Sequence, residues 1–337
     1  MITSVSRAAL LCRPYNYRCF IFSAAARNLF APKQAFFRGT GGGGGGRSNI
    51  RAMAASLSSS SGKANAEVQQ EVKLLNGVYD NYGGVVVQMT KSMDSKLFSS
   101  LIKSSLSHWK QEGKKGVWIK LPIELVSLVE VAVKEGFWYH HAEPTYLMLV
   151  NWIPGGANTL PGNASHRVGV GAFVMNEKRE VLVVQENSGR FRGTGIWKFP
   201  TGVVDKGEDI CKAVVREVKE ETSIDAEFVE VLSFRQSHQS FFGKSDLFFM
   251  CMMRPLSFEI LKQETEIEAA QWMLLEEYMA QPFVQKEGHL KQIIDICLAK
   301  LEGGGYSGFS PVPTTSTFSD QNGYLYYNAA DLKCSNI

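Results

Sequence analysis

GVVDKGEDICKAVVREVKEETSI, from Gly202 to Ile224, is the stretch of sequence that decides the fold of the second half of the chain. Residues 209–222 contain no Gly or Pro, and their apolar residues recur at steps of three and four. This spacing predicts a helix with one face packed inward. Glu208 and Asp209 would lie at its start, where acidic side chains suit the helix dipole.

Three carboxylates share one side of this predicted helix, because Glu217, Glu220 and Glu221 stand at i, i+3 and i+4. Closely spaced carboxylates raise one another's pKa or recruit a cation, and such oxygen ligands suit Mg²⁺ or Mn²⁺ better than zinc. Arg216 can neutralise part of their charge and hold a carboxylate through its fork of donors. Taken alone, this pattern is also typical of a solvated acidic helix surface.

The whole run resembles the Nudix box, the signature of the Nudix hydrolases: Gly, five residues, Glu, seven residues, Arg-Glu, an aliphatic residue, any residue, Glu-Glu, any residue, Gly and an aliphatic residue. The matching positions are Gly202, Glu208, Arg216, Glu217, Val218, Glu220, Glu221 and Ile224. Ser223 departs from the pattern, because the family has glycine there. A left-handed residue is expected just past the helix end, so serine should cost about 1 kcal/mol of stability and leave the metal site intact.

The resemblance implies a Mg²⁺- or Mn²⁺-dependent site built on this helix. The catalytic residues it implies are Glu217, Glu220 and Glu221, and the metal ligands are the same three carboxylates with the backbone carbonyl of Gly202. Arg216 and Glu208 would orient these ligands. Glycine at position 202 also permits close approach of another group, because it has no Cβ.

Two regions outside the box are further candidates. Nudix enzymes often take a general base or metal ligand from elsewhere in the chain, and Glu266, or its neighbour Glu268, suits that role; an exposed acidic loop is the alternative. A loop is predicted at residues 237–244, and its Phe241 or Phe242 would stack on an adenine of the substrate. Aromatic residues in such a loop also commonly cap a core.

The composition is that of a globular protein with room for two modest domains, at 337 residues, 45% hydrophobic and 20% charged. Residues 1–66 contain nine of the 36 Lys and Arg residues and no acid, which leaves 27 basic against 33 acidic residues in the rest. This mildly acidic balance does not favour nucleic-acid binding. Six irregularly spaced cysteines indicate neither a disulfide framework nor a zinc site. No run approaches the ~20 apolar residues of a membrane helix.

Residues 1–65 have the composition of a disordered organellar transit peptide, rich in Arg, Ser, Ala and Gly and without acidic residues. We expect the protein to act in a plastid or a mitochondrion after removal of this segment. An unstructured extension of a cytoplasmic protein is the alternative.

Residues 67–153 predict a small α/β domain. Strands are expected at 85–89, 116–121, 138–141 and 145–152, and helices at 94–111 and 122–135. This order resembles half of an acetyltransferase-like fold. Together with the run from Tyr139 to Pro144, it resembles the pre-Nudix region of plant Nudix hydrolases that act on NADH, ADP-ribose or coenzyme A derivatives, and of the animal antisense fibroblast growth factor protein. The adjacent His140 and His141 should point to opposite faces of a strand, so they are not expected to share a metal.

A linker is expected at 154–165, before the Nudix hydrolase domain at 166–302. The resemblance implies that this domain is an α/β/α sandwich around a mixed sheet. Apolar spacing predicts its second helix at 287–302, and Ser, Thr and Pro predict a loosely ordered tail at 303–337, with a short strand possible at 324–327.

The function implied is hydrolysis of the diphosphate in a nucleoside diphosphate-linked small molecule, with ADP-ribose or NADH expected as substrate. The alternative is a nucleotide sensor with little turnover. A domain that binds acetyl-coenzyme A is a weaker option, because no pyrophosphate-binding loop is evident. Family members are often dimers, so a homodimer is expected, with the N-terminal domain as candidate interface.

Overall fold

The computed structural model describes residues 73–303, 305–316, 319–329 and 332. The chain divides between Asn163 and Ala164 into two compact units. The predicted transit peptide lies outside the described residues. Within the described part, no helix combines the length and the hydropathy needed to cross a membrane.

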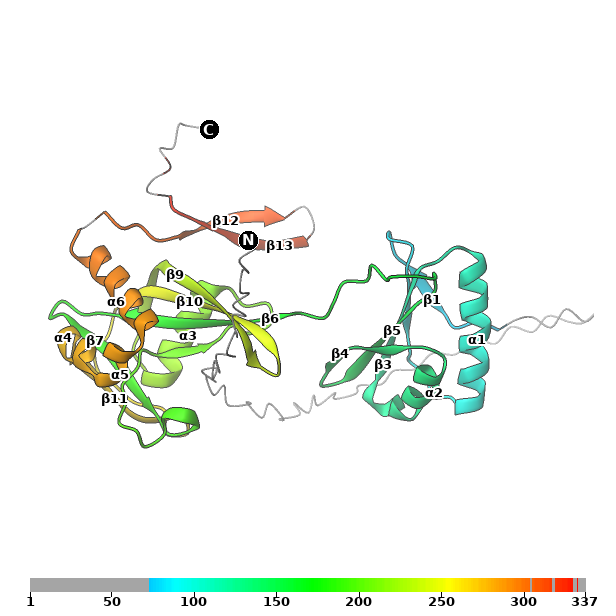
Figure 1. The fold of residues 1–337 in the computed structure, drawn as a ribbon, viewed down its shortest axis with the longest axis horizontal. Coiled ribbons are helices and arrows are strands. Elements are labelled where there is room, and N and C mark those ends of the chain that lie inside the picture. The colour runs from blue at the N-terminus through cyan, green and yellow to red at the C-terminus, as the bar shows by residue number, and fades with distance from the viewer. Residues whose placement is uncertain (1–72, 304, 317–318, 330–331, 333–337) are drawn as a thin grey trace, which may run out of the picture. The chain divides into compact units, whose positions relative to one another are not determined.

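The N-terminal unit is a mixed five-stranded sheet with its helices on one face (Figure 1). The strands lie in the order β1-β2-β3-β5-β4, with β2 and β3 parallel and the other pairs antiparallel. The elements are β1 (Gly77–Tyr79), β2 (Val85–Gln88), α1 (Ser95–Gln111), β3 (Gly116–Pro122), the 3₁₀ helix η1 (Ile123–Leu128), α2 (Val129–Lys134), β4 (Trp138–Glu143) and β5 (Tyr146–Trp152).

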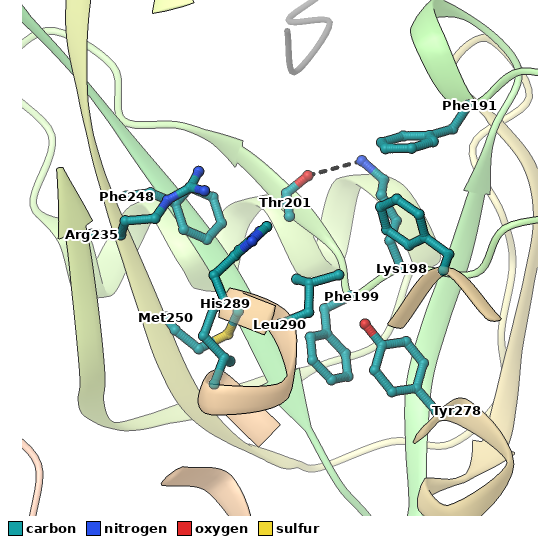
Figure 2. Close-up of a pocket in the computed structure, with 12 residues that line it drawn as sticks. Phe191, Lys198, Phe199, Thr201, Arg235, Phe248, Met250, Tyr278, His289 and Leu290 are labelled. Carbon is teal, nitrogen blue, oxygen red and sulfur yellow. Dashed lines mark hydrogen bonds between the residues drawn. The ribbon is translucent and has the colours of Figure 1, made fainter. Parts of the chain in front are cut away.

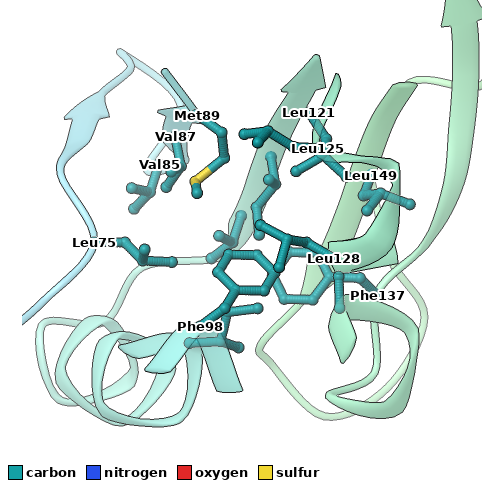
Figure 3. Packing of buried hydrophobic residues seen from close by; sticks show 14 of the residues in the cluster. Leu75, Val85, Val87, Met89, Phe98, Leu121, Leu125, Leu128, Phe137 and Leu149 are labelled. Atoms are coloured by element: carbon teal, nitrogen blue, oxygen red, sulfur yellow. The ribbon is translucent and has the colours of Figure 1, made fainter. Parts of the chain in front are cut away.

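Alternation along the strands builds the core of this unit. Val85 and Val87 are fully buried, whereas Val86 between them is exposed. These side chains pack with Phe98 from α1 and with residues from the other strands (Figure 3). Helix α1 begins after Asp94, whose Oδ1 accepts hydrogen bonds from two backbone N–H groups at 2.9 and 3.0 Å.

The expected separation of His140 and His141 is wrong. A β-bulge between Tyr139 and His141 interrupts the alternation of β4. The two histidine rings therefore meet, with their Nδ1 atoms 2.7 Å apart. The remaining ring nitrogens contact the carbonyl of Pro161 at 2.9 Å and the hydroxyl of Tyr146 at 3.3 Å.

The second unit has helices on both sides of its strands. Strands β8-β6-β10-β9 form one sheet, in which β6 and β10 are parallel, and β7 and β11 form a second. The elements are β6 (His166–Val174), β7 (Glu180–Glu186), the 3₁₀ helix η2 (Gly189–Phe191), β8 (Thr201–Val203), α3 (Ile210–Thr222), β9 (Ala226–Phe241), β10 (Lys244–Pro255), β11 (Ile267–Leu274), α4 (Leu275–Ala280), α5 (Pro282–Lys286), α6 (Gly288–Leu301), β12 (Ser310–Ser316) and β13 (Ser319–Tyr327).

Two apolar cores lie on opposite faces of the strands. One packs α3 against the sheet and includes Leu182. The other packs α4, α5 and α6 and includes the neighbouring Val181 and Val183. Because β7 is buried on both faces, it reads as a continuous apolar run. The predicted α/β/α sandwich is confirmed (Figure 1).

Two expectations about irregular segments differ from the structure. The loop predicted at 237–244 is the end of a β-hairpin, in which Ser237 pairs with Asp246 and only Phe242 and Gly243 form the turn. Its polar side chains alternate along a half-exposed hairpin, so they resemble loop residues in sequence. In place of a loosely ordered tail, β12 and β13 pair as a second hairpin, and Phe309 just before it bridges to Val231 of β9.

Candidate active site

Helix α3 holds the three box carboxylates at different depths. Asp209 precedes the helix and Ser223 follows it, and the φ of Ser223, 61°, is left-handed as predicted. Glu217 and Glu221 are buried, at 9% and 7% exposure, whereas the Glu220 side chain is 35% exposed. The helix therefore directs two carboxylates inward and leaves the third at the rim.

Arg216 connects these carboxylates to the start of the box. Its Nε and Nη2 donate to the two oxygens of Glu208, both at 2.7 Å. Its Nη1 donates to Glu217 at 2.6 Å and to Glu220 at 3.2 Å, and Nη2 also donates to the carbonyl of Val203 at 2.9 Å. The bond to Glu208 is the main cause that raises the pKa of Arg216 above its usual range. One guanidinium thus contacts three carboxylates and limits their orientation, and the role of Arg216 and Glu208 in orienting metal ligands stays a prediction.

Gly202 lies on β8 directly beside Glu217. A Cβ at this position would stand 1.9 Å from the Cδ of Glu217, a distance that no two unbonded atoms tolerate. The predicted close approach at Gly202 is therefore present, and the group that approaches is a carboxylate of the box helix.

Glu221 has an unusual environment for a carboxyl group. Burial raises its pKa to about 8, the nearby Lys198 lowers it, and Glu217 and Glu186 raise it further. Its Oε2 is buried without a hydrogen-bond partner among the described residues. A buried carboxylate oxygen without a partner is costly unless a cation approaches it.

Sequence reasoning missed the pair formed by Glu186 and Lys198. Lys198 Nζ forms an ion pair with Glu186 and donates to Thr201 Oγ1 at 3.0 Å. Both charged side chains are nearly buried, at 13% and 12% exposure. Lys198 lies outside the named strands and is joined to β7, which carries Glu186, by an isolated bridge to Val184. The only signal in the sequence was a lysine inside the apolar run that precedes Gly202.

Backbone hydrogen bonds connect Glu266 to the box helix. Its carbonyl accepts from the N–H of Asn187 at 2.9 Å, and its N–H donates to Gln263, which itself donates to the carbonyl of Glu221 at 3.0 Å. The Glu266 side chain is half-buried, whereas Glu268 is exposed. No contact joins either carboxylate to the box glutamates in the described residues, so a role for Glu266 stays a prediction.

Phe241 and Phe242 lie at the tip of the β9–β10 hairpin. Phe242 is 91% exposed, and the ring of Phe241 lies under the guanidinium of Arg167 at 5.0 Å. Neither ring lines the pocket described below. The structure therefore gives no support to their proposed stacking on an adenine.

The carboxylates fit a hard divalent cation chemically. As they stand, no three His, Cys, Asp or Glu side chains in the described part of the chain are placed to hold a metal ion together, and Arg216 bridges Glu217 and Glu220. The donor set is nevertheless all oxygen, and Glu221 Oε2 still lacks a partner. Oxygen donors of this kind suit Mg²⁺ or Mn²⁺.

A pocket adjoins the carboxylates on the face of the sheet covered by α6. Lys198 and Thr201 form one of its sides (Figure 2), and the backbone of Thr201 lies close enough to Glu221 to lower the pKa of that carboxyl group. The other lining residues are mainly aromatic and aliphatic: Phe191, Phe199, Arg235, Phe248, Met250, Tyr278, Phe283, His289, Leu290 and Ile293. Apolar walls with a few polar groups are typical of a small-molecule site.

The fold and the carboxylate helix are those of a diphosphate hydrolase, and comparisons with known families agree. Residues 165–293 match the NUDIX domain, and residues 75–153 match the domain described as "Nudix hydrolase domain". The chain belongs to the Nudix hydrolase family and is a diphosphate hydrolase of that family.

Within the family, the chain is similar to plant members. It is 62% identical over 263 residues to Nudix hydrolase 2 of Arabidopsis thaliana, covering 78% of this chain and 94% of that protein. Nudix hydrolase 10 of the same plant is 55% identical over 270 residues, covering 77% and 95%. Nucleoside diphosphate-linked moiety X motif 6 of Homo sapiens is 38% identical over 207 residues, covering 59% and 65%. The resemblance inferred from the box and the N-terminal region is confirmed.

Proposed function

We propose that the protein hydrolyses ADP-ribose or NADH with Mg²⁺ or Mn²⁺ at the box carboxylates. The observation that carries this proposal is the arrangement around α3: two buried glutamates, one of them with an oxygen that lacks a partner, beside a pocket with aromatic walls. The carboxylates suit the diphosphate chemistry. The aromatic walls suit a substrate with a flat ring.

In this proposal Glu217, Glu220 and Glu221 hold the cation, together with the Gly202 carbonyl. A divalent ion bound there neutralises charge on the diphosphate and lowers the pKa of a water molecule. Arg216 and Glu208 keep the carboxylates oriented, as their hydrogen bonds indicate. These contacts also limit how far Glu217 can move from Gly202.

The reaction adds a water oxygen to one phosphorus and breaks the bond between that phosphorus and the bridging oxygen. ADP-ribose would give AMP and ribose 5-phosphate, and NADH would give AMP and the reduced nicotinamide mononucleotide. The proton of the water goes to a carboxylate within hydrogen-bond reach, supplied by Glu217, Glu220, Glu221 or Glu266. Lys198, nearly buried beside Glu186, places a positive charge at the edge of this site.

The test is phosphate release, after phosphatase coupling, from ADP-ribose, NADH, coenzyme A, FAD and oxidised dGTP, each with Mg²⁺ or Mn²⁺. We expect turnover of ADP-ribose or NADH that Glu220→Gln reduces by about 100-fold or more, with an unchanged melting temperature. Glu259→Gln is the matched control, because Glu259 is exposed and lies outside the site. Tight binding without turnover would favour the nucleotide sensor.

Organellar location and homodimer formation also belong to this proposal. Their tests are imaging of the full chain fused to a fluorescent protein and the mass of the purified protein in solution. A diffuse cytoplasmic signal would contradict the location, and a monomeric mass would contradict the dimer.

A further inference from the structure

Arg235 is a positively charged residue on the pocket wall that has no ion-pair or hydrogen-bond partner among the described residues. It lies on β9 and is half-buried. Among the described residues, no carboxylate or carbonyl lies within ion-pair or hydrogen-bond distance of its guanidinium. By contrast, Arg216 and Arg254 each pair with a glutamate. A half-buried guanidinium without an acceptor is a ready binding group for an anion.

The sheet places Arg235 across the pocket from the carboxylates. Arg235 pairs with Phe248 of β10, whereas Thr201 pairs with Gly171 of β6. In the strand order β8-β6-β10-β9, the backbones of β8 and β9 are three strand spacings apart, roughly 14 Å. Figure 2 shows Arg235 on the opposite side of the pocket from Lys198.

Between these two sides, the floor of the pocket is formed by Phe248, whose ring lies over two glycines of β6. A Cβ at Gly171 would lie 2.7 Å from Phe248 Cζ, and a Cβ at Gly169 would lie 3.2 Å from the same ring. The Phe248 ring therefore packs flat over Gly169 and Gly171 of β6 and forms the floor of the pocket. This floor leaves room for an extended ligand between Thr201 and Arg235.

The neighbour of Arg235 does not supply a compensating negative charge. His289 also lines the pocket, and burial, followed by the charge of Arg235, lowers its pKa. The lowered pKa favours the neutral imidazole, which can donate or accept a hydrogen bond beside the guanidinium. The nearby carboxylate of Glu287 lies 3.8 Å from Nδ1 of His289, not within ion-pair distance of Arg235.

We infer that Arg235 binds a phosphate of the substrate, at the end of the diphosphate remote from Glu217 and Glu221. The ligand class is a nucleoside diphosphate derivative whose ring moiety lies against the aromatic walls. Arg235 is then a substrate-binding residue outside the box. This inference rests on the proposed function only for the identity of the anion, because the pocket and the unpaired guanidinium do not depend on turnover.

The test is calorimetric binding of ADP-ribose, NADH and coenzyme A, which share a diphosphate, to the full chain carrying Glu220→Gln. Adding Arg235→Gln should weaken the tightest of these ligands by about 10-fold or more, as expected for loss of a charge-assisted hydrogen bond. Arg235→Lys keeps the charge but loses the fork of donors, so its affinity should lie between those of the chain with Arg235 and the Arg235→Gln variant. Arg254→Gln is the matched control, because this exposed arginine pairs with Glu227 away from the pocket.

The outcomes separate this inference from the proposed function. The inference is overturned if both Arg235 variants bind all three ligands with dissociation constants within twofold of those of the chain carrying Glu220→Gln alone. It is also overturned if that chain binds none of the three ligands. If Arg235→Gln does not fold, Arg235→Lys decides alone. Arg235-dependent binding by a wild-type chain that hydrolyses nothing supports the inference and contradicts the proposed function.

Discussion

Gly202 cannot gain a side chain without moving Glu217, because its Cβ would stand 1.9 Å from the carboxylate carbon. We expect Gly202→Ala to lower turnover by about 10-fold or more, since the displaced carboxylate also pulls on Arg216. Turnover and thermal unfolding of the variant are the measurements. Gly323→Ala is the control, because nothing lies within 4 Å of a Cβ there. Equal turnover of both variants would contradict a role for this close approach.

Ser223 combines a backbone cost with a compensating bond. Its left-handed φ of 61° favours glycine, but its Oγ donates to the carbonyl of Leu261 at 2.9 Å. Ser223→Ala keeps the strain and loses the bond, so it should destabilise the protein by about 1 kcal/mol. Ser223→Gly loses the bond and relieves the strain, so it should change stability by less than about 0.5 kcal/mol. Denaturant unfolding measures both, and an alanine variant as stable as the wild type would contradict this account.

At the scale of single residues, the sequence identified those that the box pattern fixes and missed those that the fold brings together. Glu208, Arg216 and Glu217 form the network expected from their spacing. Glu186 and Lys198 belong to different segments, and only strand pairing joins them. Such a pair has no signature in local sequence.

Among the elements, the C-terminal hairpin makes an unexpected contact with the box helix. The hydroxyl of Tyr326 in β13 is buried without a hydrogen-bond partner among the described residues, and burial, followed by the neighbouring Cys211 of α3, raises its pKa. Phe309 and Tyr326 also pack on the core beneath α3. A chain that ends after Phe309 should therefore expose Cys211 and unfold at a lower temperature.

The measurement is alkylation of each cysteine, followed by peptide mass mapping. Cys211 should react several times faster in the shortened chain than in the full chain. Cys297 is the internal control, because it is buried in the core that packs α4, α5 and α6, away from the hairpin. An unchanged rate at Cys211 would show that the hairpin does not protect α3.

Long elements with strong periodicity could be predicted, and short ones could not. Residues 95–111 and 210–222 are helical close to the predicted bounds. Strand β8 has three residues and helix α4 has six, too few for a periodic pattern to show. The bulge at His140 arises from the pairing with β5, which local spacing does not reveal.

At the scale of the whole molecule, each of the two units has its own apolar core. We expect residues 73–163 and residues 164–337 each to unfold cooperatively when produced separately, because burial within each unit is complete without the other. Far-ultraviolet circular dichroism during heating is the measurement. Limited proteolysis of residues 73–337 should cut first near residues 154–163. Loss of a cooperative transition in either fragment would contradict this independence.

Removal of the metal ion tests whether these apolar cores stay folded without it. They are apolar and closed by side chains alone, and Arg216 already balances Glu217 and Glu220. A chelator should therefore abolish turnover while shifting the melting temperature by less than about 5 °C. A collapse of the fold on chelation would show that the cation is structural.

The hydrogen bonds of Arg216 to the glutamates of the box helix and to Glu208 have a practical consequence. Because Arg216 by itself orients Glu208, Glu217 and Glu220, a cation bound there as proposed should be removable by dialysis and replaceable without refolding the chain. Manganese is paramagnetic, so a reloaded sample should give an electron-spin signal that reports on each ligand placed against the helix. The catalytic centre would then serve as its own spectroscopic probe.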